Sequence, residues 1–172
     1  MVQKTVGILP DLGLPGQEAV LGSARYLAYN PLSDGTVVVG GFAFAKTAGG
    51  TDSAPFAIVS GTGEAAQAPL GLVERVQDET ITNLLSDGTN VIPEGGVVEV
   101  ALQGQFYIVV PAGLSGITTG MRVLVNPTTG AINLTAVAGE SEFLVDTGWT
   151  IVIPNGGASA GAGAVVIAQK LN

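Results

Sequence analysis

Five acidic residues gather in one stretch of this chain and are its first candidates for chemistry. Positions 64 to 87 hold them: Glu64, Glu74, Asp78, Glu79 and Asp87. Paired carboxylates can act as acid and base on a sugar, and carboxylate-rich loops bind Ca²⁺. No run has the one-three-five spacing and terminal glutamate of a calcium loop, and Trp149 is the single tryptophan available to stack on a sugar. We interpret the stretch as a solvated acidic face and predict no metal site.

A glycine pattern after residues 56–60 has the spacing of a dinucleotide-binding turn, with Gly61, Gly63 and Ala66 in place. In such a turn the glycines let the backbone approach a pyrophosphate at the start of a helix. The parallel crossover that contains the helix needs about a dozen residues or more. Only residues 64–68 separate Gly63 from Pro69. The pattern therefore predicts a glycine-rich loop and no bound cofactor.

The composition limits which residues could carry out nucleophilic catalysis, because the chain has no Cys and no His. This excludes thiolate nucleophiles, histidine general bases and zinc sites built from thiolates. Ser60, Ser115 and Ser159 lie beside or near glycines, but no spacing recommends Lys46 or Lys170 as the base for any of them. We predict that the protein is not an enzyme and has no catalytic residue.

The charge balance excludes further classes of partner. Six Lys and Arg against 14 Asp and Glu give the 172 residues a net charge of −8, which disfavours nucleic acid and anionic membranes. Two uncharged stretches, 100–121 and 147–169, are broken by Gly, Pro and polar residues, so neither predicts a transmembrane helix. The N-terminus lacks the apolar run of a signal peptide. With 47% hydrophobic and 12% charged residues, we expect part of the surface to be covered by neighbouring subunits.

Residues 1–35 differ from the rest and predict an extended N-terminal arm. Pro10, Pro15 and Pro31 stand among apolar residues spaced by Gly, a pattern that disfavours helix. A short helix over 17–29 is the less favoured alternative, because Gly22 interrupts it. An arm of this kind has no core of its own, so its apolar side chains need another surface. We predict that the residues that anchor it to that surface are Ile8, Leu9, Leu12, Leu14 and Val20.

Residues 36–172 predict a β domain, because short β-branched or aromatic runs alternate with turn residues. The runs are 36–45, 56–60, 70–76, 96–102, 105–110, 121–125, 131–135, 142–146, 150–153 and 162–170. Their spacing, with one short helix-like stretch at 78–85, predicts an all-β fold: an antiparallel sandwich or barrel, jelly-roll-like. The pair Gln103-Gly104 predicts a two-residue hairpin between its flanking runs.

The aromatic residues of these runs are predicted to lie in the core or in subunit contacts rather than in a ligand cage. They are Phe42, Phe44, Phe56, Phe106, Tyr107, Phe143 and Trp149.

Several short segments follow one another along the chain in an arrangement typical of one family. The first half carries Thr5-Val-Gly-Ile8, Gly16-Gln-Glu-Ala-Val-Leu-Gly22 and Thr36-Val-Val-Val-Gly-Gly-Phe-Ala-Phe44. The second half carries Glu99-Val-Ala-Leu-Gln-Gly-Gln-Phe106, Gly120-Met-Arg-Val-Leu-Val-Asn126 and Gly130-Ala-Ile132. Over about residues 5–170, this arrangement resembles the structural cement (capsid decoration) proteins of tailed bacteriophages.

The resemblance implies a small β protein, made in the bacterial host cytoplasm, that assembles as a dimer or trimer on the outer surface of the virion capsid. It implies that the major capsid protein is the partner and that the arm helps to bridge neighbouring capsid subunits. It supplies no catalytic residue and no cofactor. A head-fibre or glycan-binding β module of the virion surface is the alternative, and a carboxylate-based hydrolase is a third hypothesis.

Overall fold

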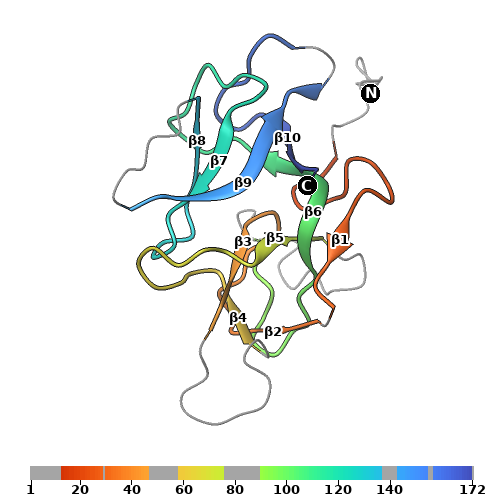
Figure 1. Cartoon of the computed structure of the whole chain (residues 1–172), viewed down its shortest axis with the longest axis vertical. Helices are drawn as coiled ribbons and strands as arrows, with labels where there is room; N and C mark the ends of the chain where they lie inside the picture. The colour runs from red at the N-terminus through yellow and green to blue at the C-terminus, as the bar shows by residue number, and fades with distance from the viewer. Residues whose placement is uncertain are drawn as a thin grey trace, which may run out of the picture.

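The computed structural model describes residues 13–28, 30–46, 58–75, 90–136, 143–154 and 157–171. Within these ranges the chain forms ten β-strands and no α-helix (Figure 1). The strands are β1 (Arg25–Tyr26), β2 (Leu32–Ser33), β3 (Phe42–Ala45), β4 (Ile58–Ser60), β5 (Gly71–Val73), β6 (Val100–Val109), β7 (Arg122–Val125), β8 (Ile132–Thr135), β9 (Val145–Val152) and β10 (Val165–Lys170). The all-β prediction is confirmed.

The strands form one mixed sheet in the order β2-β4-β3-β5-β6-β10-β9-β7-β8, and β1 pairs with β6 outside this path. Neighbouring strands are antiparallel except β2 and β4, which are parallel. The two end strands, β2 and β8, do not pair with each other, so the sheet is not a closed barrel. In Figure 1, β7 to β10 form the upper part, β2 to β5 the lower part, and β6 runs between them.

The long central strand β6 corrects the predicted hairpin at Gln103-Gly104. The chain does not reverse there; β6 continues through Gly104 and pairs with β5 at Ala101 and with β10 from Gly104 to Val109. Gly104 has a φ of 133°, a conformation that residues with a side chain rarely adopt. The glycine therefore marks a bend within a strand, which the local sequence does not distinguish from a turn.

Strand β9 corrects a second predicted break. The sequence predicts separate strands at 142–146 and 150–153, but β9 runs without interruption from Val145 to Val152. Gly148 has a φ of 75°, and the pairing of β9 with β7 shifts register between Val123 and Leu124. A bulge absorbs the turn-like residues of β9 without ending the strand.

Two buried clusters cover the two faces of the sheet where β3, β5 and β6 meet. Successive side chains of a strand point to opposite faces, and Phe42, Leu72 and Ala101 enter one cluster while their neighbours Ala43, Val73 and Val100 enter the other. The first cluster also contains buried apolar residues from β7, β9 and β10, and the second also contains Val37, Val59, Ile92 and Val98. These three strands therefore belong to both cores at once.

Trp149 lies at the centre of the first cluster. Its ring meets Phe42 edge-on at 6.5 Å and Phe106 at 6.0 Å between ring centroids, and only 1% of the residue is exposed. Phe44 is also buried, whereas Phe143 is exposed. The predicted core role is thus confirmed for Phe42, Phe44, Phe106 and Trp149, and Phe56 lies outside the described residues.

The two helix predictions have different outcomes. Residues 17–28 contain turns and β1 in place of the less favoured helix, and residues 78–85 lie outside the described part of the chain. The described ranges contain no helix long and apolar enough to cross a membrane.

Candidate functional site

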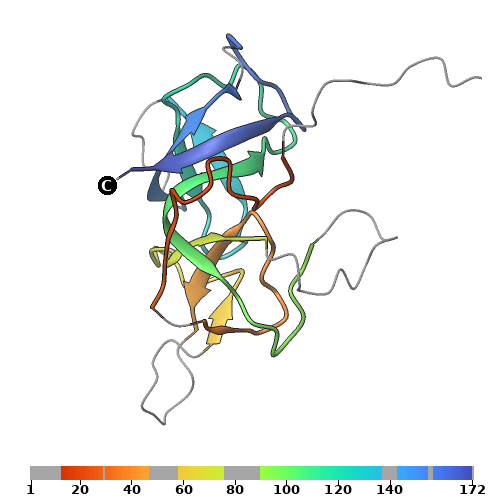
Figure 2. The same ribbon diagram turned by 90° about the vertical axis from the view of Figure 1, so that its right-hand side faces the viewer.

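Residues 13–28, which we call the strap, run antiparallel along one side of β6 (Figure 2). The Gly16 amide donates to the Tyr107 carbonyl at 2.8 Å, the Tyr107 amide to Gln17 at 3.0 Å, and the Ala19 amide to Gln105 at 2.7 Å. Farther along, β1 pairs with Gln103 and Ala101, and the Leu27 amide donates to Val100 at 3.0 Å. The strap thus occupies the side of β6 that β5 and β10 leave open.

The start of the strap is fixed by close contacts at Pro15 and Gly16. The Arg75 Nε donates to the Pro15 carbonyl at 3.0 Å, and the Arg75 amide donates to the Gly16 carbonyl at 2.9 Å. A Cβ on Gly16 would lie 2.6 Å from the Val39 side chain, and its φ is 80°. The backbone therefore approaches the sheet at a distance that only glycine allows.

The outward surface of the strap carries large apolar side chains. Leu14 is 57% exposed, Val20 50% and Leu21 90%. Two of the predicted anchors, Leu14 and Val20, thus stand on the surface, while Ile8, Leu9 and Leu12 lie outside the described residues. Leu21 was not among the predicted anchors, although it continues the same apolar run after Val20. We call Leu14, Val20 and Leu21 the strap surface.

Three carboxylates lie where the strap meets the sheet: Glu18, Glu74 just after β5, and Glu99 just before β6. The Glu18 Oε1 accepts hydrogen bonds from the amides of Ser23 and Ala24, at 2.7 and 2.9 Å, and so closes the turn that carries Leu21. Burial raises the pKa of Glu74, and the negative charges of Glu99 and Glu18 raise it further, against the opposing effect of a hydrogen bond from Tyr26. Burial and the same hydrogen bond raise the pKa of Tyr26.

Of the acidic stretch predicted from sequence, the structure describes Glu64 and Glu74. Glu64 is exposed, and Asp78, Glu79 and Asp87 lie outside the described ranges. The carboxylates near Glu74 come instead from distant parts of the chain, which no local pattern reveals. The described residues include no group of three carboxylates suited to hold a metal ion.

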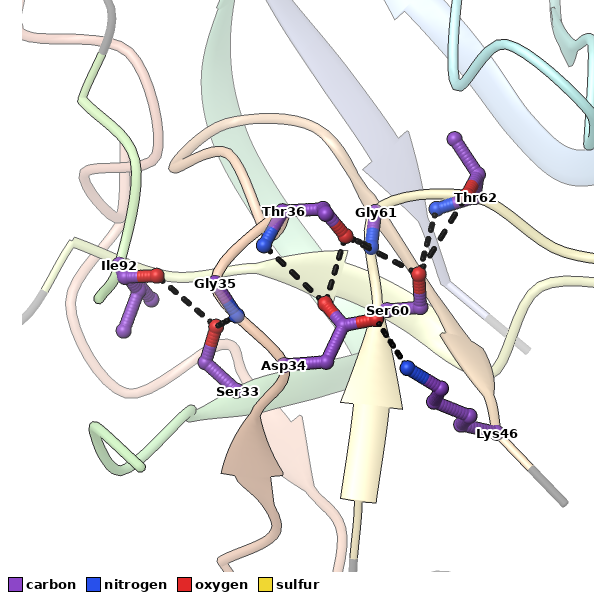
Figure 3. Close-up of polar contacts among 9 residues, drawn as sticks. All are labelled: Ser33, Asp34, Gly35, Thr36, Lys46, Ser60, Gly61, Thr62 and Ile92. Atoms are coloured by element: carbon purple, nitrogen blue, oxygen red, sulfur yellow. Dashed lines mark hydrogen bonds and ion pairs between the residues drawn. The ribbon is translucent and has the colours of Figure 1, made fainter. Parts of the chain in front are cut away.

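A polar network ties together the ends of β2, β3 and β4 (Figure 3). Asp34 Oδ1 accepts hydrogen bonds from the Thr36 amide at 3.0 Å and hydroxyl at 2.6 Å, and Lys46 Nζ lies 3.1 Å from Asp34 Oδ2. The hydroxyl groups of Thr36 and Ser60 lie 3.0 Å apart, and the Thr36 hydroxyl accepts the Gly61 amide at 3.0 Å.

The network does not have the pairing expected of a serine activated by a lysine base. Lys46 is paired with Asp34, and the Ser60 hydroxyl lies beside that of Thr36. Burial acts to raise the pKa of Asp34, but hydrogen bonds from Thr36, Lys46 and Ser60 outweigh it and lower the pKa. A carboxylate with a lowered pKa is a weak general base. The network instead fixes three strand ends, and Asp34 accepts the amide two residues further on, as Asp commonly does in turns.

The remaining glycine and serine motifs lie in loops. A Cβ on Gly61 would lie 2.2 Å from the Thr36 carbonyl oxygen, and residues 61–70 form a loop that leads to β5 with no helix, as predicted. Ser159 stands in Gly157-Ala-Ser-Ala-Gly161, which has the spacing of a nucleophile elbow. An elbow places its serine between a strand and a helix, whereas Ser159 is exposed in a loop that precedes β10, and the chain has no His.

A family model described as structural cement protein (E217 gp24/Pam3 gp6) matches residues 2–170. The chain belongs to this family. No curated protein matches it. A chain in a solved structure titled "The capsid of Myoviridae Phage XM1" is similar to this cement protein, with a TM-score of 0.61 and 15% identity over 99% of this chain and 94% of that chain.

These comparisons confirm the family resemblance and the predicted class of function. The protein is a structural capsid cement protein of a phage, and its place is the virion. The similar structure, at 15% identity, supports the fold alone.

Proposed function

We propose that this cement protein binds the outer surface of an assembled tailed-phage capsid and bridges neighbouring major capsid subunits through its arm. The observation that carries the proposal is the strap surface: Leu14, Val20 and Leu21 face outward on a segment that is hydrogen-bonded to β6 along its length. The arm anchors Ile8, Leu9 and Leu12 would extend this apolar contact toward the N-terminus.

The mechanism is stabilisation by preferential binding. A protein that binds only the assembled capsid stabilises that state by its binding free energy, and many copies multiply a modest contact. Apolar burial contributes about 25 cal/mol per Å². Because the strap is already held by the sheet, its side chains lose little freedom on docking, which leaves more of that contribution as affinity.

We also propose a dimer or trimer as the bound form, with synthesis in the cytoplasm of the bacterial host. The high share of apolar residues and the low share of charged residues support self-association. We further infer that the protein is not an enzyme. Two observations support this inference. The family is described as structural, and Lys46 forms a salt bridge with Asp34.

The strap surface is tested by co-sedimentation of the purified protein with capsids of its phage that lack it. We expect L21S to weaken binding severalfold, because it removes the most exposed apolar side chain of the strap. The matched control is F143S, which removes an aromatic side chain, 67% exposed, that precedes β9. Equal binding by L21S and the unchanged protein, or a larger loss in F143S, would refute the assignment.

A second experiment separates the arm anchors from the strap. Removal of residues 1–12 deletes Ile8, Leu9 and Leu12 but leaves intact every strap contact described above. We expect this truncated protein to keep its thermal unfolding midpoint and to lose capsid binding. Undiminished binding would show that the anchors lie elsewhere. A longer deletion, to residue 20, would also remove the pairing with Gln105 and Tyr107 and confuse folding with binding.

A further inference from the structure

The half-buried side chain of Glu74 lies at the junction of the strap and the sheet. Its Oε2 atom is buried and has no hydrogen-bond partner. The Glu74 backbone amide donates to the Glu99 carbonyl at 2.9 Å, so the two residues are held side by side. A buried polar atom without a partner loses hydration and gains nothing in return.

The groups that face Glu74 are negative or neutral. Glu18 and Tyr26 come from the strap and Glu99 from the approach to β6. Arg75, the next residue, directs its Nε to the Pro15 carbonyl. In the ranges that the structure describes, the ion pairs are Lys46–Asp34 and Arg122–Asp146, so neither Glu74 nor its acidic neighbours has a cationic partner there.

We propose that Glu74 makes attachment of the strap dependent on pH, so that the strap is held more tightly when Glu74 is protonated than when it is ionised. Two of the three groups that face Glu74 stand on the strap. If the strap separates from β6, Glu74 is hydrated and moves away from the charge of Glu18; it also loses the hydrogen bond from Tyr26, an effect that burial outweighs in the closed structure. Ionised Glu74 therefore favours local opening, whereas protonated Glu74 can donate a hydrogen bond to a neighbouring carboxylate.

The direction of the pH effect on strap closure follows from the linkage between closure and protonation of Glu74. The pKa of Glu74 is raised in the closed structure, first by burial and also by the charges of Glu99 and Glu18; the hydrogen bond from Tyr26 opposes this rise but does not cancel it. The closed strap therefore binds the proton more tightly than the open strap does. Closure gains strength as the pH falls through the raised pKa toward the ordinary value of 4.5, and it loses this contribution as the pH rises above the raised pKa.

Amide hydrogen exchange of the purified protein tests the proposal, without reference to where the capsid is bound. The amides of Ala19 and Leu27 report on the strap, and the Ile151 amide, bonded to Met121, reports on the core. After correction for chemical exchange, we expect severalfold greater protection of the strap amides at about pH 5 than at about pH 7.5, without a parallel change at Ile151.

Two variants isolate the carboxylate. E74Q is nearly isosteric and should increase strap protection at the higher pH and remove most of the difference between the two conditions. E99Q removes one facing charge and should reduce the difference in part. E94Q, at an exposed glutamate, is the matched control and should leave the difference unchanged. An unaltered difference in E74Q, or the same effect in E94Q, would overturn the proposal.

Discussion

Replacement of Trp149 by Ala should remove the centre of the larger core. Trp149 is the only tryptophan, it is 1% exposed, and its ring touches Phe42 of β3 and Phe106 of β6 edge-on. It therefore connects β9 with two strands that also supply the second core through their neighbouring residues. A cavity at this position is expected to weaken both cores, since β3 and β6 cannot loosen on one face alone.

The free energy of unfolding that W149A loses lies between known limits. Truncation of a buried aromatic residue to Ala costs about 3–5 kcal/mol, and edge-on aromatic pairs add about 0.5–1.5 kcal/mol each beyond the buried area. Single domains have free energies of unfolding of about 5–15 kcal/mol. We therefore expect W149A to lose about 3–5 kcal/mol, at the upper end if the contacts with Phe42 and Phe106 do not re-form with other residues.

Urea unfolding followed by far-ultraviolet circular dichroism measures this loss, because the variant has no tryptophan fluorescence. F143A is the control: it removes an exposed aromatic side chain and should change the free energy by about 0.5 kcal/mol or less. The unfolding should remain a single transition, because the two cores share β3, β5 and β6. A loss below about 1 kcal/mol in W149A, or two separate transitions, would refute this account of the fold.

The other predictions concern the backbone and the polar network. G71A should lose about 1–3 kcal/mol in the same assay, because its Cβ would lie 2.2 Å from the Ala101 carbonyl oxygen and would force β5 from β6. The control G161A, where nothing lies within 4 Å of the added Cβ, should be nearly neutral. D34N should lose about 1 kcal/mol near neutral pH, through its bonds to Thr36 and Lys46. Because the pKa of Asp34 is lowered, the ionised group contributes stability above the ordinary value of 3.8, and the difference between D34N and the original protein should shrink as the pH falls below it. An acid-stability profile that is parallel for the two proteins would contradict this.

The strand composition of the protein was predictable because it depends on local preference. Runs such as 121–125 and 131–135 are β-branched and bounded by turn residues, and they became β7 and β8 with nearly those limits. The rejection of a dinucleotide site at Gly61 also depended on a local count of residues, and the structure confirms the loop. Arrangement of short segments along the whole chain was enough to indicate the family.

Gly104 and Gly148 show where local patterns failed. Each stands in a turn-like pair, and each lies inside a strand with a positive φ. A glycine with such a backbone either reverses a chain or bends a strand, and the choice depends on which segments pair on both sides of it. For Gly104 those segments are the strap and β10, which lie far away in the sequence.

The sequence by itself determined the chemistry that this protein lacks and the strand-forming character of its chain, because both depend on residue types and short-range preference. Tertiary structure alone decided that Gly16 and Ala19 pair with a strand near residue 106, and that Glu18, Glu74 and Glu99 share one junction. The physical reason is that backbone hydrogen bonds and buried charges act between residues that are neighbours in space, even when they lie far apart along the chain. A strand pattern predicts that a residue will pair, but it does not predict which partner it pairs with.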